Sequence, residues 1–326
     1  MKNVFKMLGV SMAFALTFGS GQSMAQEFPN KPIKLIVGYA PGGSNDILAR
    51  LVGQKLSEQV GQPVIIENKP GADARIASEF AAKSAPDGYT LLIGASGAMT
   101  LNPALFAPLN YDPVKDFVPI TLLGAAPLVV VTHPSHPSKS LKDLVALAKA
   151  KQGEMFYSSG APPMFVAAEH FKKQVGIQMT HVPFKGSGPS IAAVMANEVP
   201  VGMVELPSAL PQLKAGRINA LAVTDTKRSP YLPDVPTVKE AIGMDFEGGI
   251  WVGLYAPAGT PQPIVDKLYR EVSKAVKSDA VRERMVSLSY DVSGSGMPPA
   301  EFDKYFKERL TRWTKVIKDN NLTVKR

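Results

Sequence analysis

The amino-acid sequence predicts an α/β protein composed of two α/β domains joined by two crossover strands. Three patterns support this fold class. Short apolar runs alternate with one-sided helical patterns along most of the chain, as is typical of strands and helices in α/β units. Most of these runs end in turns rich in glycine, proline and serine. Two longer apolar stretches, Phe117–Thr132 and Gly248–Ala256, contain glycine, as we expect of strands that pass between domains.

The chain begins with the features of a secretory signal peptide, which we predict over residues 1–25. Two lysines precede the apolar run Met7–Phe18, and Ser23–Ala25 forms a small-x-small cleavage site. A retained membrane anchor is the alternative, but the run is shorter than the ~20 residues that a spanning helix needs. We therefore expect a mature chain that starts at Gln26.

Composition narrows the class of protein further. A chain of 326 residues with 45% hydrophobic content is long enough for two sizeable cores. The absence of cysteine excludes disulfides and thiol chemistry, and it suits a soluble monomer of an oxidising compartment, the bacterial periplasm. The net charge is +8, but basic and acidic residues are interleaved, so we expect a solvated surface, no nucleic-acid partner and no cofactor.

The stretch Leu35–Arg50 predicts a strand, a glycine turn and the start of a helix. The apolar run Leu35–Val37 leads into the turn Pro41–Gly43, and Ser44–Asp46 are candidate caps of the helix that follows. Such a turn gathers free backbone N–H groups at the positive end of a helix dipole, which favours a carboxylate or a phosphate. An ordinary βα turn with a purely structural role is the alternative.

The next elements repeat this arrangement. The first helix carries one apolar stripe and ends at Gly61. We then predict a buried parallel strand over Pro63–Asn68, a helix through Ile76 and Ala81, and a strand over Tyr89–Ala95. Small or polar residues follow each strand, and a right-handed βαβ sheet brings such positions to one edge.

The βα rhythm continues beyond the first long apolar stretch. Ser140 and Asp143 predict the capped start of a helix, and Thr260 predicts another, with Pro261 at the first helical position. The predicted elements are the helix Leu141–Ala150, the strand Met155–Ser159, the helix Val166–Val175, the strand Gln178–Val182, the helix Ser190–Ala196, the strands Val201–Glu205 and Ala220–Thr224, and the helices Pro261–Val276, Asp279–Arg284 and Pro299–Asn320.

The two long apolar stretches set the expected domain boundaries. Gly124–Pro127 and Phe246–Gly249 are our hinge candidates. The first domain is then discontinuous, 26–125 plus 247–326, and the second is 126–246. Two α/β domains joined in this way leave a cleft that strand ends face from both sides.

Several segments resemble one family and occur in the same order along nearly the whole mature chain. They are FPNKPIKLIVGYAPGGSNDILARLV, GQPVIIENKPGA, PDGYTLLIGASG, NPALF, YDPVKDFVPIT, THVPFKG, AGRINALAVT, LPDVPTVKEA and WVGLYAPAGTP. Together they resemble the substrate-binding proteins of tripartite tricarboxylate transporters, the TctC or Bug family of the periplasm. The resemblance implies a Venus-flytrap, periplasmic-binding-protein fold, a carboxylate held between the domains, and delivery of that ligand to membrane permease subunits.

The resemblance also implies which residues line the pocket, and these lie at the strand ends described above. In the family, backbone amides, hydroxyls and ordered waters bind the carboxylate, which agrees with the anion-binding character of a helix N-terminus. The residues that match the family's pocket loops are Tyr39, Pro41, Gly42, Gly43, Ser44, Asn45 and Asp46; Ser96, Gly97, Ala98, Met99 and Thr100; Ser158, Ser159, Gly160 and Ala161; and Phe184, Lys185, Gly186, Ser187 and Gly188.

Three departures from the family pattern bear on the identity of the acid. Where the family has GAGG, this chain has Gly71–Arg75, so Arg75 is a candidate partner for a second carboxylate and Asp73 for a ligand ammonium or hydroxyl. Alternatively, these two charges pair with each other or face water. Met164 and Phe165 replace small polar residues and form either an apolar wall or core. The family's aspartate is missing near Glu205, to which we transfer no role.

The main rival is an enzyme, and the sequence lacks the motifs that an enzyme of the common classes needs. It has no cysteine, no Gly-x-Ser-x-Gly elbow, no phosphate-binding loop and no zinc helix. His133 and His136 lack a third nearby metal ligand, and His181 is expected to be structural. We expect no enzyme and no metal site. A receptor that reports to a sensor kinase remains open, because the same cleft serves both roles.

Overall fold

The computed structural model describes residues 28–322, so the predicted signal peptide lies outside the described residues. The strands are β1 (Ile33–Val37), β2 (Val64–Asn68), β3 (Thr90–Ala95), β4 (Phe117–Thr132), β5 (Phe156–Ser159), β6 (Thr180–Pro183), β7 (Val201–Glu205), β8 (Asn219–Val223) and β9 (Gly249–Pro257). The helices are α1 (Ser44–Val60), η1 (Ala72–Ala74), α2 (Arg75–Ala82), η2 (Gly97–Leu101), α3 (Asn102–Leu105), α4 (Leu141–Ala150), α5 (Pro162–Val175), α6 (Ser187–Met195), α7 (Leu206–Lys214), α8 (Val238–Ile242), α9 (Gln262–Lys277), α10 (Asp279–Ser287) and α11 (Pro299–Asp319).

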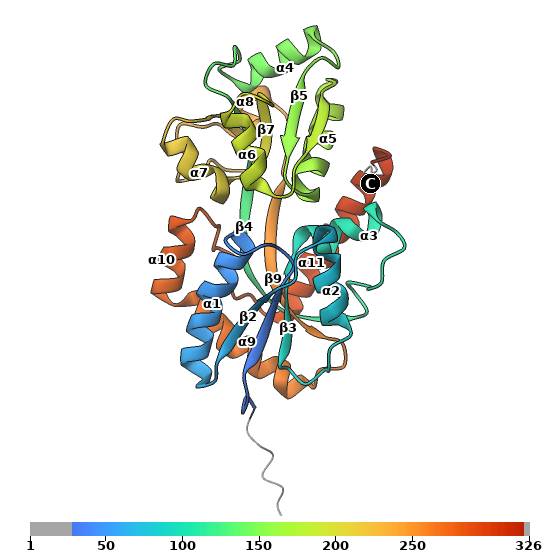
Figure 1. The fold of residues 1–326 in the computed structure, drawn as a ribbon, viewed down its shortest axis with the longest axis vertical. Coiled ribbons are helices and arrows are strands. Elements are labelled where there is room, and N and C mark those ends of the chain that lie inside the picture. Colours follow the sequence, from blue (N-terminus) through green and yellow to red (C-terminus); the bar gives the residue numbers. More distant parts are fainter. Residues whose placement is uncertain (1–27, 323–326) are drawn as a thin grey trace, which may run out of the picture.

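The strands form one curled sheet whose two halves share β4 (Figure 1). In one half the order is β2-β1-β3-β9-β4, with β1 parallel to β2 and β3 and with β9 antiparallel to both of its neighbours. In the other half β4 lies between β7 and β8, antiparallel to both, and β5 pairs in parallel with β6 and β7. Helices cover both halves, which confirms the predicted mixed α/β fold with two crossover strands.

The strand β4 has the same bounds as the first long apolar stretch. It pairs with β9 from Phe117 opposite Pro257 to Pro127 opposite Gly249, and its remaining residues pair with β7 and β8. The register against β9 shifts next to Gly124, so the predicted hinge position contains an irregular ladder. Most of β4 is buried, because elements of both halves pack against it.

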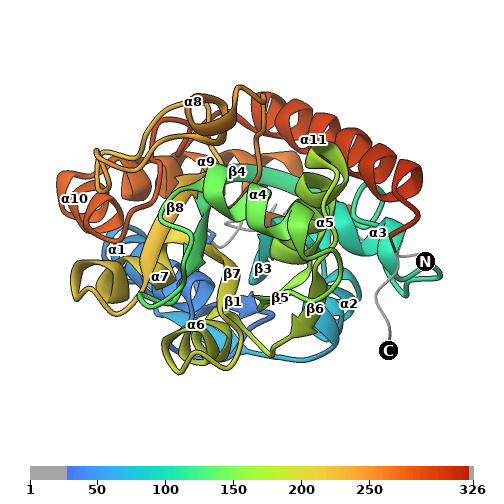
Figure 2. The same ribbon diagram turned by 90° about the horizontal axis from the view of Figure 1, so that it is seen from above.

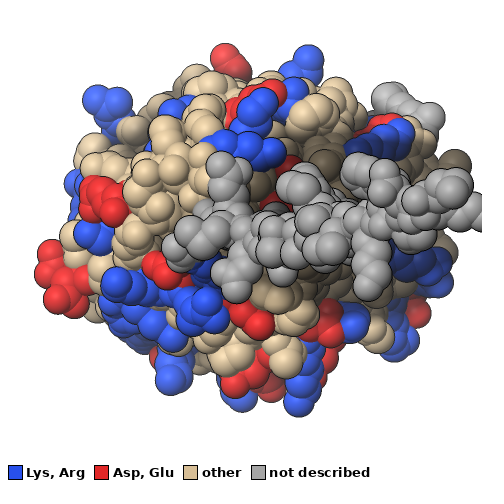
Figure 3. Space-filling view, turned by 90° about the horizontal axis from the view of Figure 1, so that it is seen from below, with Lys and Arg blue, Asp and Glu red and all other residues tan. Residues whose placement is uncertain are grey.

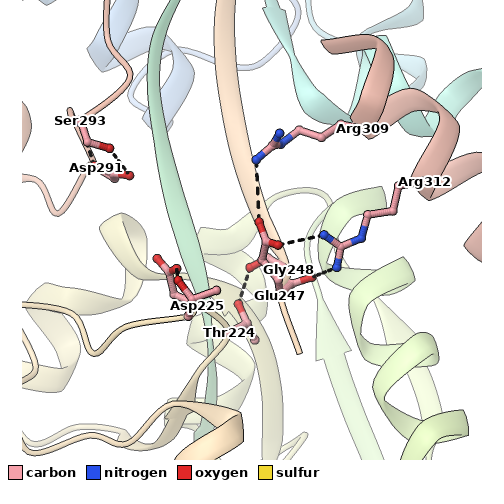
Figure 4. A network of polar contacts seen from close by, with 9 residues as sticks. Thr224, Asp225, Glu247, Gly248, Asp291, Ser293, Arg309 and Arg312 are labelled. Carbon is pink, nitrogen blue, oxygen red and sulfur yellow. Dashed lines mark hydrogen bonds and ion pairs between the residues drawn. The ribbon is translucent and has the colours of Figure 1, made fainter. Parts of the chain in front are cut away.

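Polar contacts fasten the second crossover just before β9 (Figure 4). Arg312 of α11 donates to Glu247 Oε2 at 2.9 Å and to the Glu247 carbonyl at 3.3 Å, and Arg309 Nη2 lies 3.7 Å from Oε1. The Gly248 N–H donates to the carbonyl of Thr224, at the end of β8, at 3.0 Å. The predicted hinge at Phe246–Gly249 is therefore tied to a helix of one half and to a strand of the other.

An aromatic cluster joins α11 to the crossover strand β9. Phe302 and Phe306 of α11 pack against Trp251 and Tyr255, with ring centroids 5.3 to 6.2 Å apart. Gly253 lies between those two strand residues, and a Cβ at this position would come within 2.1 Å of the Phe302 ring. The glycine in this apolar stretch is thus required by close packing. Figure 2 shows α11 running along one side of the molecule.

The observed helix starts correct two predicted caps. The N-cap of α1 is Gly43, so none of Ser44–Asp46 occupies the cap position. The N-cap of α9 is Pro261, and the Thr260 hydroxyl donates to the Pro257 carbonyl at 2.7 Å instead of to the helix. The capping box of α4, formed by Ser140 and Asp143, is confirmed.

Other elements differ from prediction for identifiable reasons. Predicted as buried, β2 is only half buried, because it is an edge strand that pairs with β1 alone. Helix α5 begins four residues earlier than predicted, at Pro162, since proline is well suited to a first helical turn. We did not predict α7, which follows β7 directly and contains Pro211, and we did not predict the short helix α8.

The surface carries both charge signs side by side on the face seen in Figure 3. None of the helices within residues 28–322 is long and apolar enough to cross a membrane. The described part of the chain also holds no group of three or more histidine, aspartate or glutamate side chains arranged to bind a metal ion. Of the two loop histidines, His133 contacts Ser135, and the buried His136 accepts a hydrogen bond from the Ser138 N–H.

Candidate ligand-binding site

Asp46 holds the turn between β1 and α1 in place. Gly42 has φ +81°, which glycine adopts without steric cost, and its N–H donates to Asp46 Oδ2 at 2.9 Å. Arg50 donates to both carboxylate oxygens, and Asn68 donates to Oδ1. Burial raises the pKa of Asp46, but these hydrogen bonds outweigh burial and hold the pKa below its usual value. We predicted Asp46 as a ligand contact, and the structure shows that its carboxylate fastens this turn.

The start of α1 offers hydrogen-bond donors and one free acceptor. The first backbone N–H groups of an α-helix have no acceptor within the helix, and here they follow the exposed residues Pro41 and Gly43. Asn45 Oδ1 is buried without a hydrogen-bond partner among the described residues. The Ser44 hydroxyl donates to Glu205 Oε1 at 3.0 Å. This turn is therefore both approachable and polar, as an anion site requires.

The loop after β2 has an unusual backbone. Ala72, Asp73 and Ala74 have φ values of 47°, 54° and 64°, a left-handed conformation that costs residues other than glycine roughly 1–2 kcal/mol each. Glycine adopts this conformation without that cost, which suits it to positions 73 and 74, where the pattern GAGG has glycine. Burial raises the pKa of Asp73, and the nearby charge of Arg75 opposes the rise. Arg75 Nε donates to the Ala72 carbonyl at 2.7 Å, and its guanidinium lies 4.4 Å from the Phe106 ring. That Asp73 or Arg75 contacts a ligand stays a prediction.

The residues after β3 form a buried helical turn, and the sequence did not predict this helix. The Ser96 hydroxyl is buried and has no partner among residues 28–322, whereas the Thr100 hydroxyl donates to the Ser96 carbonyl. Gly97 has the Tyr39 hydroxyl and Pro163 beside it. The Met99 side chain is fully buried in the aromatic cluster of β9 and α11, so it belongs to the core and not to a binding surface.

The two predicted loops of the other half touch each other through glycines. The Gly186 N–H donates to the Gly160 carbonyl at 2.8 Å, and the Phe184 N–H donates to the Ser159 carbonyl at 2.9 Å. A Cβ on Gly160 would lie 2.3 Å from the Gly186 carbonyl carbon, so only glycine permits this approach. The loops that follow β5 and β6 therefore form one unit. Ala161, at the N-cap of α5, ends this loop, while Lys185 is exposed and Gly188 lies open to solvent.

Each of the two serines that end β5 contacts a partner that the sequence did not assign. Ser158 accepts a hydrogen bond from the Ser190 hydroxyl at 2.8 Å. Ser159 Oγ lies 2.8 Å from His181 Nε2, and the imidazole packs between the rings of Tyr157 and Phe165. Burial lowers the pKa of His181 to about 4, so the ring is neutral at pH 7. His181 thus holds the position of one predicted pocket serine.

The two halves meet directly at Glu205, a residue to which the sequence assigned no role. Its Oε1 accepts from Ser44 at 3.0 Å and from Ser208 at 2.8 Å, and Ser187 also hydrogen-bonds to the carboxyl group. Burial raises the pKa of Glu205, although the three serine hydroxyls act in the opposite direction. Burial, together with the negative charges of Asp73 and Glu205, raises the pKa of the Tyr39 hydroxyl.

The structure thus brings together predicted residues from four loops: Tyr39 and Ser44, Asp73, Gly97, and Ser187. Sequence reasoning missed Ser208 and Tyr290, whose hydroxyl donates to the Ser44 carbonyl at 2.9 Å. Glu205 ends a strand just before a helix, the same position as the predicted pocket residues, and that signal was present in the sequence. Tyr290 lies outside any motif, and only the tertiary contact reveals it.

Known proteins resemble this chain along most of its length. The family described as tripartite tricarboxylate transporter family receptor matches residues 48–322. Protein BugT of Bordetella pertussis is 32% identical over 327 residues, which cover 99% of this chain and 100% of that protein.

Two solved structures from Rhodopseudomonas palustris, each 32% identical in sequence, have a similar fold. A protein solved with adipate has a TM-score of 0.86 and covers 91% of this chain and 100% of its own. MatC with bound malate has a TM-score of 0.82 and covers 89% of this chain and 100% of its own.

Proposed function

This chain belongs to the tripartite tricarboxylate transporter receptor family, and on that premise we propose that it is a periplasmic receptor that captures a small carboxylate between its two domains. The observation that carries the proposal is the meeting of loops from both halves at the start of α1. Ser44 there contacts Glu205 of the other half at the free backbone N–H groups of the helix start. The buried hydroxyl of Ser96, which follows the neighbouring strand β3, has no partner among residues 28–322.

The similar structures support the class of ligand. One was solved with adipate and another with malate, both of which are carboxylates. We propose that this chain takes a dicarboxylate or tricarboxylate, an aromatic acid or an amino acid. The residues that we propose as contacts are those predicted from the sequence in the four loops, apart from Asp46, which fastens its own turn, and Met99, which belongs to the core. Ser96 and the α1 backbone lie nearest to the carboxylate.

We propose that the two domains close around the ligand by bending at the crossovers. The irregular register at Gly124 supports bending at the first crossover, and the second crossover at Phe246–Gly249 passes between the same two halves. The domain boundaries, 26–125 plus 247–326 and 126–246, follow from them. A ligand that contacts both domains binds the closed form more tightly than the open form, and it therefore shifts the population toward closure.

The proposed partner is the permease of a tripartite tricarboxylate transporter, to which the closed receptor delivers its ligand. The family description and the predicted signal peptide support this assignment. A receptor for a sensor kinase uses the same closure and differs only in its outer surface. A pull-down of membrane proteins with the liganded receptor distinguishes the two partners.

We propose that the protein catalyses no reaction. Ser159 and His181 are close enough for a nucleophile and a base, which favours a hydrolase as the alternative. However, the nearby carboxylate of Glu169 accepts hydrogen bonds from Tyr157 and Lys172, and these contacts engage it away from the imidazole. A histidine with a pKa of about 4 is also a weak base at neutral pH.

A thermal-shift screen of the mature protein tests the proposed ligand class. The screen compares monocarboxylates, dicarboxylates, tricarboxylates, aromatic acids and amino acids with neutral sugars and cations. We expect at least one carboxylate to raise the melting temperature, because a ligand that binds only the folded state stabilises it. Stabilisation by neutral sugars or cations alone contradicts the proposal.

Gly43→Val tests whether the ligand approaches the α1 turn. A Cβ on Gly43 has only the Ala40 carbonyl oxygen near it, at 3.4 Å, so the variant should fold. The added side chain should block the backbone N–H groups and weaken binding of the carboxylate found in the screen at least about tenfold, the equivalent of one charge-assisted hydrogen bond. Ala85→Val, at an exposed position, is the control. Unchanged affinity would show that the turn is only structural.

A further inference from the structure

Glu205 places a buried acid at the junction of three helix starts. Ser44 is the first residue of α1 and Ser187 the first of α6, while Glu205 itself is the N-cap of α7, whose Ser208 also donates to it. The side chain is 8% exposed. Hydroxyl groups and helix starts therefore surround this carboxylate.

A carboxylate ligand bound at the start of α1 lies next to this acid. Ser44 Oγ, on the first residue of α1, is 3.0 Å from Glu205 Oε1, so a ligand on the α1 backbone comes within a few ångströms of Glu205. Asp73 is a second acid near this site, because its negative charge and that of Glu205 both raise the pKa of the Tyr39 hydroxyl. Like charges at such separations repel each other strongly where burial excludes water.

The remaining polar groups of the site are of two kinds. The α1 backbone N–H groups and the buried Ser96 hydroxyl are donors, which suit a carboxylate. Glu205 and Asp73 are acids, of which Glu205 already accepts from three serines, and Asn45 Oδ1 is a buried acceptor that has no hydrogen-bond partner among the described residues. A ligand without a donor leaves Asn45 Oδ1 unsatisfied and places its negative charge beside Glu205 with no group to offset it, and both effects weaken binding.

We propose that Glu205 determines specificity by selecting carboxylates that carry an ammonium or hydroxyl group close to the carboxylate over acids without such a donor. The inference rests on the proposed function, and it narrows that function to amino acids and hydroxy acids. Glu205 accepts the donor while the start of α1 and Ser96 hold the carboxylate.

Isothermal titration calorimetry with matched triads of acids tests the proposal on the mature protein. The triads are propionate, lactate and alanine; succinate, malate and aspartate; and phenylacetate, mandelate and phenylglycine. Within each triad only one substituent changes from hydrogen to hydroxyl to ammonium. Malate and succinate carry the same charge, so their comparison separates the donor from the net charge. We expect the donor-bearing members of the bound triad to bind at least about tenfold more tightly than the plain acid.

The variant Glu205→Gln assigns the effect to this residue. The amide oxygen can still accept from the serines, but the NH₂ group presents a donor where the ligand needs an acceptor. We expect the preference within the triad to fall at least about fivefold, whereas Glu58→Gln, an exposed residue on α1, should leave it unchanged. Circular dichroism checks the fold of the variant. If Glu205→Gln does not fold, the triads on the unchanged protein still test the inference, because a plain acid that binds as tightly as its hydroxy and amino partners overturns it.

The outcomes separate this inference from the proposed function. A plain acid bound as tightly as its hydroxy and amino partners overturns the selection by Glu205 and leaves the carboxylate receptor intact. A preference that survives in Glu205→Gln assigns selection to another residue and also overturns the inference. Failure of all nine acids to bind overturns the inference, and the thermal-shift screen then decides whether the proposed function still holds.

Discussion

Thr224 and Gly248 are joined by two hydrogen bonds in opposite directions. The Gly248 N–H donates to the Thr224 carbonyl at 3.0 Å, and the Thr224 hydroxyl donates to the Gly248 carbonyl. The same hydroxyl oxygen accepts from the N–H of Leu128 at 2.9 Å. Since Leu128 belongs to β4 and Gly248 directly precedes β9, one buried side chain links the two crossover strands.

Replacing Thr224 with valine should destabilise the protein by about 1–3 kcal/mol. The substitution keeps the shape of the side chain but removes the hydroxyl that serves both crossovers, and buried polar groups that lose a partner cost about this much. Urea unfolding at pH 7 measures the change. Thr226→Val is the control, because the exposed Thr226 hydroxyl donates to the neighbouring Asp225, and it should change stability by less than about 0.5 kcal/mol. Equal midpoints for the two variants would contradict the role of Thr224.

Asp46→Asn should lower stability by about 1.5–3 kcal/mol at pH 7, because the new NH₂ group cannot accept from Arg50 or Gly42. The pKa of Asp46 is lowered in the folded state, so its contribution is present above the unfolded pKa of about 3.9 and is lost as pH falls through the folded pKa. Unfolding at pH 7 and pH 3 should show a difference that shrinks at pH 3.

The control for Asp46 is Asp319→Asn, an exposed aspartate that pairs with Lys315 on α11. A surface pair of this kind contributes less than about 1 kcal/mol. If the two variants lost equal stability at pH 7, Asp46 would not be the residue that holds the β1–α1 turn.

Gly160→Ala should cost about 1–3 kcal/mol, the range for overpacking, because its methyl group would strike the backbone of Gly186. Gly188 lies two residues after Gly186, and a Cβ at this position meets no atom within 4 Å, so Gly188→Ala should hardly change stability. Thermal unfolding compares the pair. The same comparison with ligand present should show weaker binding only for Gly160→Ala. A stable Gly160→Ala variant would mean that these two loops are free to separate.

Because of His181, the protein should lose stability as the pH falls from 6.5 to 4. Burial lowers the pKa of His181 in the folded state to about 4. Between pH 6.5 and pH 4 the unfolded chain therefore binds a proton that the folded chain does not, and the free energy of unfolding decreases by at most about 1.4 kcal/mol for each unit by which the pH falls. Burial also lowers the pKa of His136 and His170, which act in the same direction. His181→Gln should therefore lose less stability than the unchanged protein from pH 7 to pH 5. Equal losses would argue against this account.

The order of elements and several of their bounds could be predicted from the sequence. The bounds of β4, β7 and α4 agree with the predicted ranges, because continuous apolar runs and the Ser140 capping box are local signals. The Pro-Gly turn before α1 also follows from local residues. Where prediction failed, at the caps of α1 and α9, the expected side chain bonds elsewhere: Ser44 donates to Glu205 of the other half, and Thr260 donates to the Pro257 carbonyl three residues before it.

What the sequence by itself determined is the alternation of strands and helices, the glycine turns at strand ends and the family to which they point. Only the tertiary structure decided that Asp46 serves its own turn, that Met99 belongs to the core, that Ser159 meets His181, and that Glu205 joins the two halves at Ser44. Residues 44 and 205 are far apart in the chain, and no periodic pattern couples their side chains. Their contact exists because β4 and β9 place the start of α1 opposite the end of β7. Only this arrangement puts the carboxylate of Glu205 beside the proposed carboxylate site.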